Sequence, residues 1–397
     1  MRFSSAFIVC CFAGTASAAT INVTTPDDVI AENGQCSLRE AITAANTDSA
    51  FMGCTPGNGA DEIMLAALEY RLDIAGAGED ANASGDLDIR SDMSIRGAGA
   101  DVTRIRGDRD DRVFDIASPA TTVLVEGVTI RNGAGMLGGG IFNAAGVSLR
   151  VENCSLTGNA TTQGGGIASL GALEVVNSVF HANDATSGGG IWSGGGGTTT
   201  LRNVTFDSNT SLESGSAASF NADATLNNVT VSQNIADSDF DDIGDGALEI
   251  NAVVRISNSI VARNLDLSIG GSGLISPDCA VGVGGAFDSD GHNLIGILGN
   301  ACALSPAGVG DKSGTAAQPL NPLLQPFAVY GGTVEVFLPK AISPAVEAGS
   351  PLAVGMSGAC EATDARGISR PQATRCDIGA AELDDLIFRG GFDPPLP

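Results

Sequence analysis

Apolar and polar residues alternate on both sides of an asparagine that recurs through the middle of the chain. In one copy, Leu149 and Val151 precede Asn153, and Cys154 and Leu156 follow it, each at alternate positions. Each side has the period of two that is typical of a half-buried β-strand, and the phase slips by one residue at the asparagine. The pattern predicts two short strands that meet at a corner occupied by the asparagine.

This pattern recurs about every 25 residues, which is the signature of a solenoid. Gly127 stands at the corner of the first regular copy, and a Gly-Gly-Gly-Ile element precedes three later corners. A helical solenoid would not tolerate such glycine triplets, because glycine destabilises helix interiors. The sequence therefore predicts an all-β fold, a right-handed parallel β-helix. The five later corners are Asn153, Asn177, Asn203, Asn228 and Asn258.

We expect these five corner asparagines to adopt the left-handed conformation that asparagine tolerates. Neighbouring strands lie about 4.8 Å apart, so amides at the same corner of successive coils are close enough to hydrogen-bond. The sequence thus predicts an asparagine ladder along this corner.

Both ends of such a rod would expose unpaired strand edges, so caps are expected. Residues 19–58 suit an N-terminal cap, because Ser37 and Glu40 form a capping box ahead of a short amphipathic helix. We assign residues 59–345 to the β-helix, residues 346–383 to a C-terminal end and residues 384–397 to a tail.

The first residues have the pattern of a signal peptide. Arg2 is followed by an apolar run over residues 3–12 and by Ala16-Ser17-Ala18, the small-residue pattern that signal peptidase cleaves. We therefore expect residues 1–18 to be removed and the mature chain to be secreted or held at the cell surface. No later stretch has the ~18 consecutive apolar residues that a membrane span requires.

Seven cysteines follow the expected leader. Six of them form three pairs whose members lie close together in the sequence. Each pair would close a short loop, as in exported proteins of oxidising compartments. Cys154 lies inside a repeat where other copies carry Val or Ser, which predicts a small buried apolar side chain. The expected disulfides are Cys36 with Cys54, Cys279 with Cys302, and Cys360 with Cys376.

The chain has 46 Asp and Glu against 20 Lys and Arg, a formal net charge of −26. A field of that sign repels polyanions, so nucleic acid, anionic lipid and pectate are poor partners unless a metal bridges them. One Trp and two Tyr are too few for an aromatic carbohydrate groove. Trp192 is expected to be a core or rim contact, with a sugar-stacking platform as the alternative.

Acidic residues gather in the longest repeat. Asp237, Asp239 and Asp241 have the spacing that opens a calcium loop, although Asp242 replaces the turn glycine. They are candidate Ca²⁺ ligands, with a solvated acidic loop as the alternative. We assign no catalytic residue and no other cofactor, because the basic residues that sugar chemistry would need are missing beside these acids. His181 is expected to be a solvated turn residue without a role.

Two groups of motifs resemble known families. Cys36-Ser37-Leu38-Arg39-Glu40-Ala41 resembles the signature of the CSLREA-domain family, and residues 257–382 are similar to the choice-of-anchor Q family. The repeats also resemble those of chlamydial polymorphic outer-membrane proteins. The resemblance implies an exported bacterial β-helix protein without a defined enzymatic activity. The motifs of the second family are residues 290–296, 321–324, 343–345, 363–367, 370–371 and 376–380.

We therefore predict a non-enzymatic secreted or cell-surface protein with an adhesive, binding or structural role, whose partner is an unidentified surface, matrix or glycan ligand. The alternative is a polysaccharide lyase or glycoside hydrolase of the pectin-lyase-like fold. A cleft with clustered Asp and basic residues would favour the enzyme. A surface of hydroxyl and amide side chains would favour binding.

Overall fold

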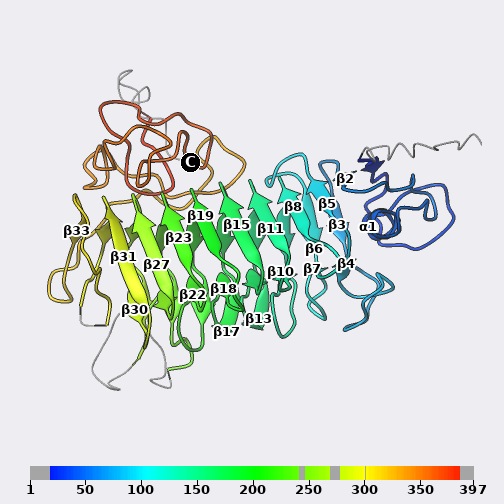
Figure 1. The fold of residues 1–397 in the computed structure, drawn as a ribbon, viewed down its shortest axis with the longest axis horizontal. Helices are drawn as coiled ribbons and strands as arrows, with labels where there is room; N and C mark the ends of the chain where they lie inside the picture. Colours follow the sequence, from blue (N-terminus) through cyan, green and yellow to red (C-terminus); the bar gives the residue numbers. More distant parts are fainter. Residues whose placement is uncertain (1–17, 241–245, 269–277, 300, 385–397) are drawn as a thin grey trace, which may run out of the picture.

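The computed structural model describes residues 18–240, 246–268, 278–299 and 301–384. Over these residues the chain winds through four ladders of parallel strands (Figure 1). One coil runs through β11 (Ser148–Glu152), β12 (Ser155–Thr157), β13 (Ala160–Gln163) and β14 (Ile167–Ser169). The ladders that contain these strands are called the first, second, third and fourth sheets. The prediction of an all-β parallel β-helix is confirmed.

The first and second sheets each have ten strands. In order, the first sheet contains β1 (Thr20–Asn22), β2 (Asp61–Met64), β5 (Met93–Arg96), β8 (Thr122–Glu126), β11, β15 (Ala172–Val176), β19 (Thr199–Arg202), β23 (Ala224–Asn227), β27 (Val253–Ser257) and β31 (Ala286–Gly291). The second contains β3 (Glu69–Arg71), β6 (Arg104–Arg106), β9 (Thr129–Arg131), β12, β16 (Val179–His181), β20 (Thr205–Asp207), β24 (Thr230–Ser232), β28 (Ile260–Val261), β32 (Leu294–Ile295) and β33 (Lys312–Ser313).

The third and fourth sheets have five and eight strands. The third contains β13, β17 (Asp184–Ser187), β21 (Thr210–Ser211), β25 (Ile235–Ala236) and β29 (Leu265–Asp266). The fourth contains β4 (Leu87–Ile89), β7 (Phe114–Ile116), β10 (Ile141–Asn143), β14, β18 (Ile191–Ser193), β22 (Ala218–Phe220), β26 (Leu248–Ile250) and β30 (Cys279–Val281).

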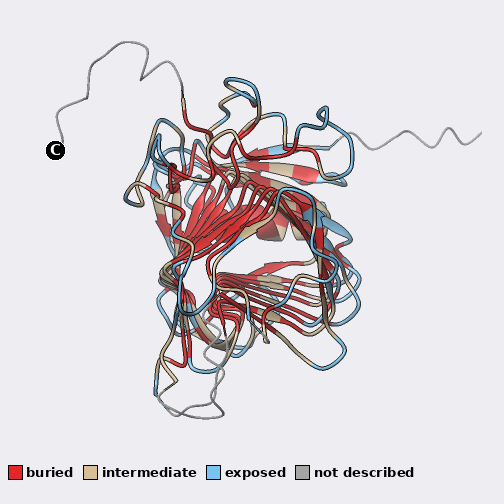
Figure 2. Cartoon of the chain, turned by 90° about the vertical axis from the view of Figure 1, so that its left-hand side faces the viewer, coloured by how far each residue is buried: buried red, intermediate tan, exposed pale blue. Residues whose placement is uncertain are grey.

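The alternating apolar residues point into the coils and stack on their counterparts in neighbouring coils. Figure 2 shows this buried interior running along the axis of the rod. In the second sheet, Leu156 pairs with Phe180 and Phe180 with Phe206, and the two phenyl rings stack with centroids 4.9 Å apart. Each such fully buried side chain contributes about 1.5–3 kcal/mol relative to exposure.

The N-terminal cap contains helix α1 (Leu38–Thr47), whose capping box is confirmed. The Ser37 side chain accepts a hydrogen bond from the Glu40 N–H, and the Glu40 carboxylate accepts one from the Ser37 N–H. The fully buried Arg39 forms a bidentate ion pair with Asp28 and donates to the carbonyls of residues 84–86 of the first complete coil. The motif that resembles the CSLREA signature therefore ties the cap to the solenoid.

The opposite end of the rod is covered by residues 298–299 and 301–311. Leu298 and Leu304 pack against the main core, and Cys302 is disulfide-bonded to Cys279 in the last strand of the fourth sheet. The other two predicted disulfides, Cys36–Cys54 and Cys360–Cys376, are also present. Cys154 is buried and free, as expected.

The chain after β33 folds back along the outside of the rod. Residues 315–384, here called the C-terminal segment, lie over the second sheet and its corner with the first (Figure 1). Outward-facing Val179 and Ile260 are buried beneath Val334 and Phe337 of this segment. The solenoid boundary expected at residue 345 therefore falls inside the segment, because its apolar residues pack on the outer face of the sheet. The first sheet, conversely, already begins with β1, inside the range assigned to the cap.

Candidate functional site

The corner between the first and second sheets carries a row of left-handed residues. Gly127, Asn153, Asn177, Asn203, Asn228 and Asn258 all have φ between 49° and 65°. Asn203 donates to the Asn177 side chain at 3.0 Å and to the Thr363 carbonyl at 2.9 Å. Asn228 and Asn258 instead donate to carbonyls of the C-terminal segment, at Gly379 and Gly358. The predicted left-handed corner is present, but three of its five amides anchor the C-terminal segment.

The continuous asparagine ladder lies at a different corner, between the second and third sheets. Each buried amide there donates to the next side-chain oxygen at 2.9–3.0 Å. The ladder was predicted at the first asparagine of each repeat, whereas the second is the one whose side chain points inward. The ladder consists of Asn159, Asn183, Asn209, Asn234 and Asn264, and it ends on Asp278.

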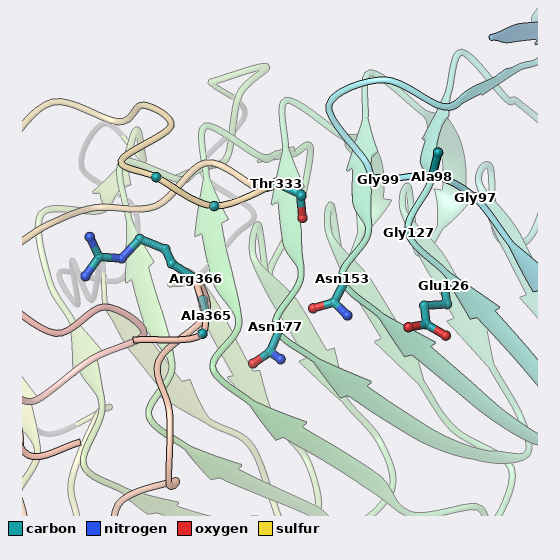
Figure 3. A pocket seen from close by; sticks show the side chains of 13 residues that line it. Gly97, Ala98, Gly99, Glu126, Gly127, Asn153, Asn177, Thr333, Ala365 and Arg366 are labelled. Carbon is teal, nitrogen blue, oxygen red and sulfur yellow. The ribbon is translucent and has the colours of Figure 1, made fainter. Parts of the chain in front are cut away.

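A groove of about 600 Å³ lies where the first corner is left uncovered by the C-terminal segment (Figure 3). Asn153 and Asn177 form its floor at successive corners, with Glu126 beside them. Thr333 and Arg366 of the C-terminal segment form the opposite wall. Almost half of the lining is glycine, which leaves backbone groups accessible to a ligand. The lining glycines are Gly97, Gly99, Gly127, Gly331, Gly332 and Gly367.

Most charged groups of the groove are already paired. The Glu126 carboxylate binds the guanidinium of Arg96. Arg366 donates from Nε and Nη2 to one carboxylate oxygen of Asp364, and it also donates to the carbonyls of Tyr330 and Glu382. The Asn153 side-chain amide, in contrast, makes no hydrogen bond within the described part of the chain. The groove therefore presents an amide and a hydroxyl, with backbone groups, and its lining contains a single carboxylate.

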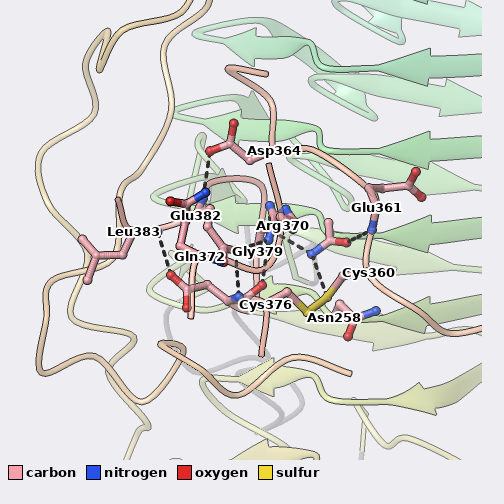
Figure 4. A network of polar contacts seen from close by, with 12 residues as sticks. Asn258, Cys360, Glu361, Asp364, Arg370, Gln372, Cys376, Gly379, Glu382 and Leu383 are labelled. Carbon is pink, nitrogen blue, oxygen red and sulfur yellow. Dashed lines mark hydrogen bonds and ion pairs between the residues drawn. A yellow bond between two sulfur atoms is a disulfide. The ribbon is translucent and has the colours of Figure 1, made fainter. Parts of the chain in front are cut away.

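The C-terminal segment is held in place by a buried polar network (Figure 4). Arg370 pairs with Glu382 at 3.1 Å and donates to the carbonyls of Asp377 and Gly379. Burial, with the neighbouring Glu382 charge, raises the pKa of Asp377 to about 7. The motifs that resemble the choice-of-anchor Q family supply most of these groups. Their arrangement is that of a structural clamp which positions the groove wall.

A second cluster of perturbed acids lies at the N-terminal end of the fourth sheet. Burial raises the pKa of Asp86 to about 8, with further contributions from the Asp111 and Asp88 charges, and burial raises that of Asp88 to about 6. Asp86 is only 3% exposed and lies beneath the cap, near Arg112. These acids are enclosed and are therefore not placed to meet a substrate.

The candidate calcium ligands differ in how far they are buried. Asp237 is buried after β25, Asp239 is exposed, and Asp241 lies outside the described residues. Among the residues that the structure describes, no group of three His, Cys, Asp or Glu side chains is arranged to hold a metal ion. The Ca²⁺ site stays a prediction.

Trp192 and His181 both lie on outer faces of the rod. Trp192 is half-buried in the middle of β18, and its ring lies over Gly194, where a Cβ would collide with it. This is the rim contact that the sequence predicted. His181 hydrogen-bonds to Asp207 at 2.8 Å, which raises the pKa of the imidazole, and stacks on Phe327 of the C-terminal segment. His181 is therefore a packing residue rather than a solvated turn residue.

The groove could not be found from the sequence, because Thr333 and Arg366 are nearly two hundred residues from the corner that they face.

In the described ranges, no helix is long and apolar enough to cross a membrane. In the comparisons with known proteins, no family model, no curated protein and no solved structure matches this chain.

Proposed function

We propose that this chain is an exported, non-enzymatic binding protein whose corner groove takes a neutral segment of a glycan. One observation carries this proposal: the groove is lined by amide, hydroxyl and glycine backbone groups around the unpaired amide of Asn153. Sugar hydroxyls donate and accept hydrogen bonds at once, and an amide with exposed backbone N–H and C=O groups can do the same. Glycine walls allow a chain of rings to approach the backbone closely.

The pairing of charges in the groove supports binding rather than catalysis. Glycoside hydrolysis uses two carboxyl groups on opposite sides of the scissile bond, and a lyase needs a base beside an acidic proton. Glu126 is held by Arg96, and Arg366 is held by Asp364. The acids with the most strongly raised pKa values, Asp86 and Asp377, are enclosed by the cap and the C-terminal clamp.

Export is supported by the three disulfides. Such bonds persist in oxidising compartments and are rare in reducing ones. One disulfide lies in the N-terminal cap, and another joins β30 to the residues that cover the opposite end of the rod. The third lies within the C-terminal segment. The signal-peptide pattern that also supports export lies in residues 1–18, of which 1–17 are outside the described residues.

The test is binding of the purified chain to a panel of neutral polysaccharides, measured for the wild type and for Asn153→Gly. Glycine accepts the φ of 53° at this corner, so the variant loses the amide without backbone strain. We expect binding to weaken about tenfold with an unchanged melting temperature. The matched control is Asn132→Gly, which also has a left-handed φ of 59° but lies outside the groove.

Two results would overturn the proposal. One is that Asn153→Gly binds every polysaccharide that the wild type binds, with the same affinity. The other is release of new reducing ends or unsaturated uronate by the wild type, with or without Ca²⁺, which would indicate a hydrolase or a lyase.

A further inference from the structure

Three arginines stand in register on the outer face of the second sheet, at its N-terminal end. Arg71 of β3 pairs with Arg106 of β6, and Arg106 pairs with Arg131 of β9. Because neighbouring strands lie about 4.8 Å apart, the three guanidinium groups leave the sheet as one row. Arg104 lies on the same face, one outward position away. Like charges directly opposite one another destabilise a sheet, so this row has an energetic cost.

Other charged rows on the rod are compensated from coil to coil. On the first sheet, Arg96 lies between Glu62 and Glu126 and pairs with both. Three coils further on, Glu174 lies between Arg150 and Arg202 and pairs with both. The arginine row is therefore an exception in a chain with 46 acidic residues against 20 basic ones.

One carboxylate contacts this row. Glu69 binds Arg71 at 2.7 Å and Arg131 at 2.7 Å. Arg106, between them, forms no hydrogen bond or ion pair with any described residue, although its charge helps to lower the pKa of Glu69. The Nε of Arg131 is buried without an acceptor. Guanidinium groups thus outnumber carboxylates, and donors remain unfilled.

We propose that the row of Arg71, Arg106 and Arg131 binds an extended anionic polysaccharide through its carboxylate or sulfate groups. Planar guanidinium groups bind such anions bidentately, and the row runs across three successive coils. The net charge predicted that polyuronates are repelled, and the row reverses this expectation locally. Asp73 and Asp108 follow the row at the adjacent turns without pairing with it. Because salt screens the attraction between the exposed guanidinium groups and the polymer, binding should weaken as the ionic strength rises.

The surroundings of the row favour a polysaccharide over a single-stranded nucleic acid. Proteins that bind single strands stack bases on aromatic side chains. The residue that follows Arg131 along this row is Thr157, which offers a hydroxyl group instead of an aromatic ring. The strands β3 and β6 lie beyond the C-terminal segment, toward the N-terminal end of the rod (Figure 1). The Arg71 side chain is 56% exposed and that of Arg131 is 33% exposed.

The experiment titrates the full chain with polygalacturonate, dextran sulfate, neutral dextran and poly(dT), in low salt with a chelator. The key variant is Arg106→Gln. Because Arg106 has no partner and faces two like charges, its removal is expected to raise the melting temperature while it weakens polyanion binding about tenfold. A merely structural arginine would not give a stabilised protein with weaker binding. Preference for polygalacturonate or for dextran sulfate identifies the anion.

The matched control is Arg255→Gln on the first sheet, whose side chain is 54% exposed and paired with Asp288 and Asp290. It should bind the anionic polymers as the wild type does, and so should Asn153→Gly, because this site is separate from the corner groove. The proposal is overturned if Arg106→Gln binds polygalacturonate and dextran sulfate as tightly as the wild type. It is also overturned if Arg255→Gln weakens binding equally, or if poly(dT) binds more tightly with the same dependence on Arg106.

Discussion

The side-chain amide of Asn264 donates to the carboxylate of Asp278 at 2.9 Å, and this contact ends the asparagine ladder. Every amide of the ladder donates toward the next coil, so the last one has an N–H group and no further asparagine to receive it. A carboxylate suits that place because it only accepts hydrogen bonds. Asn293, whose side-chain oxygen accepts a hydrogen bond from the Ser259 N–H, likewise donates to the carboxylate of Asp311 at 3.1 Å.

Replacing Asp278 with Ala should destabilise the rod by about 2–3 kcal/mol, since it leaves one N–H of the buried Asn264 amide and the Ile297 N–H without acceptors. Urea unfolding measures this loss. Asn251→Ala, which removes an exposed amide contact with Asn221, is the control and should change stability by less than about 0.5 kcal/mol. An equal loss of stability in both variants would mean that the contact between Asn264 and Asp278 contributes no more than an exposed amide contact.

Replacing Arg39 with Lys should destabilise the N-terminal cap by about 3 kcal/mol. The ammonium group keeps the charge but loses the planar fork that reaches Asp28 and the carbonyls of residues 84–86 at once. Urea unfolding, followed with far-ultraviolet circular dichroism, measures the effect. Arg255→Lys, at an exposed site, should be nearly neutral. If Arg39→Lys unfolds at the same urea concentration as the wild type, the cap is not held by this side chain.

Stability should rise as the pH is lowered from about 9 to about 5. Burial raises the folded-state pKa of Asp86 to about 8, of Asp377 to about 7 and of Asp278 to about 6. Between the unfolded value and these values the folded state binds more protons, so stability falls with increasing pH across that window. Thermal unfolding in a series of buffers measures the slope.

Asp86→Asn provides the matching variant, because the amide resembles the protonated carboxyl and does not titrate. It should be more stable than the wild type at pH 9 and similar at pH 5. A wild type whose melting temperature is the same at both pH values would contradict the assignment of raised pKa values to the folded state.

Removing the Cys360–Cys376 disulfide should loosen the C-terminal segment and spare the rod. A loop of this length is worth about 3 kcal/mol to the segment. Arg366 has a buried side chain and is followed by Gly367, so trypsin should cleave after it only when the segment leaves the second sheet. We expect Cys360→Ser with Cys376→Ser to accelerate cleavage at this site. Cleavage after the exposed Arg255 serves as the internal comparison, and a uniform increase at all sites would indicate global unfolding instead.

Much of the rod could be predicted because its signals are local. The alternation around Asn153 and its copies identifies strands by side-chain period, and Ser37 with Glu40 identifies a helix start three residues apart. The two cysteines of each disulfide also lie close together in the sequence. The ladder was assigned to the wrong asparagine because Asn153 and Asn159 have the same spacing in every repeat. Only the twist of the backbone between them decides which amide points inward.

The sequence by itself determined the repeating coil, its left-handed corners and its N-terminal cap, because each depends on contacts between residues that are close in the chain or one repeat apart. The tertiary structure alone decided where residues 315–384 lie, and with them the groove between Asn153 and Thr333. It also decided that Arg71, Arg106 and Arg131 share a row, because they belong to irregular coils of different length whose register no local pattern reveals. Both candidate binding surfaces therefore arise from packing across coils, where the sequence carries no periodic signal.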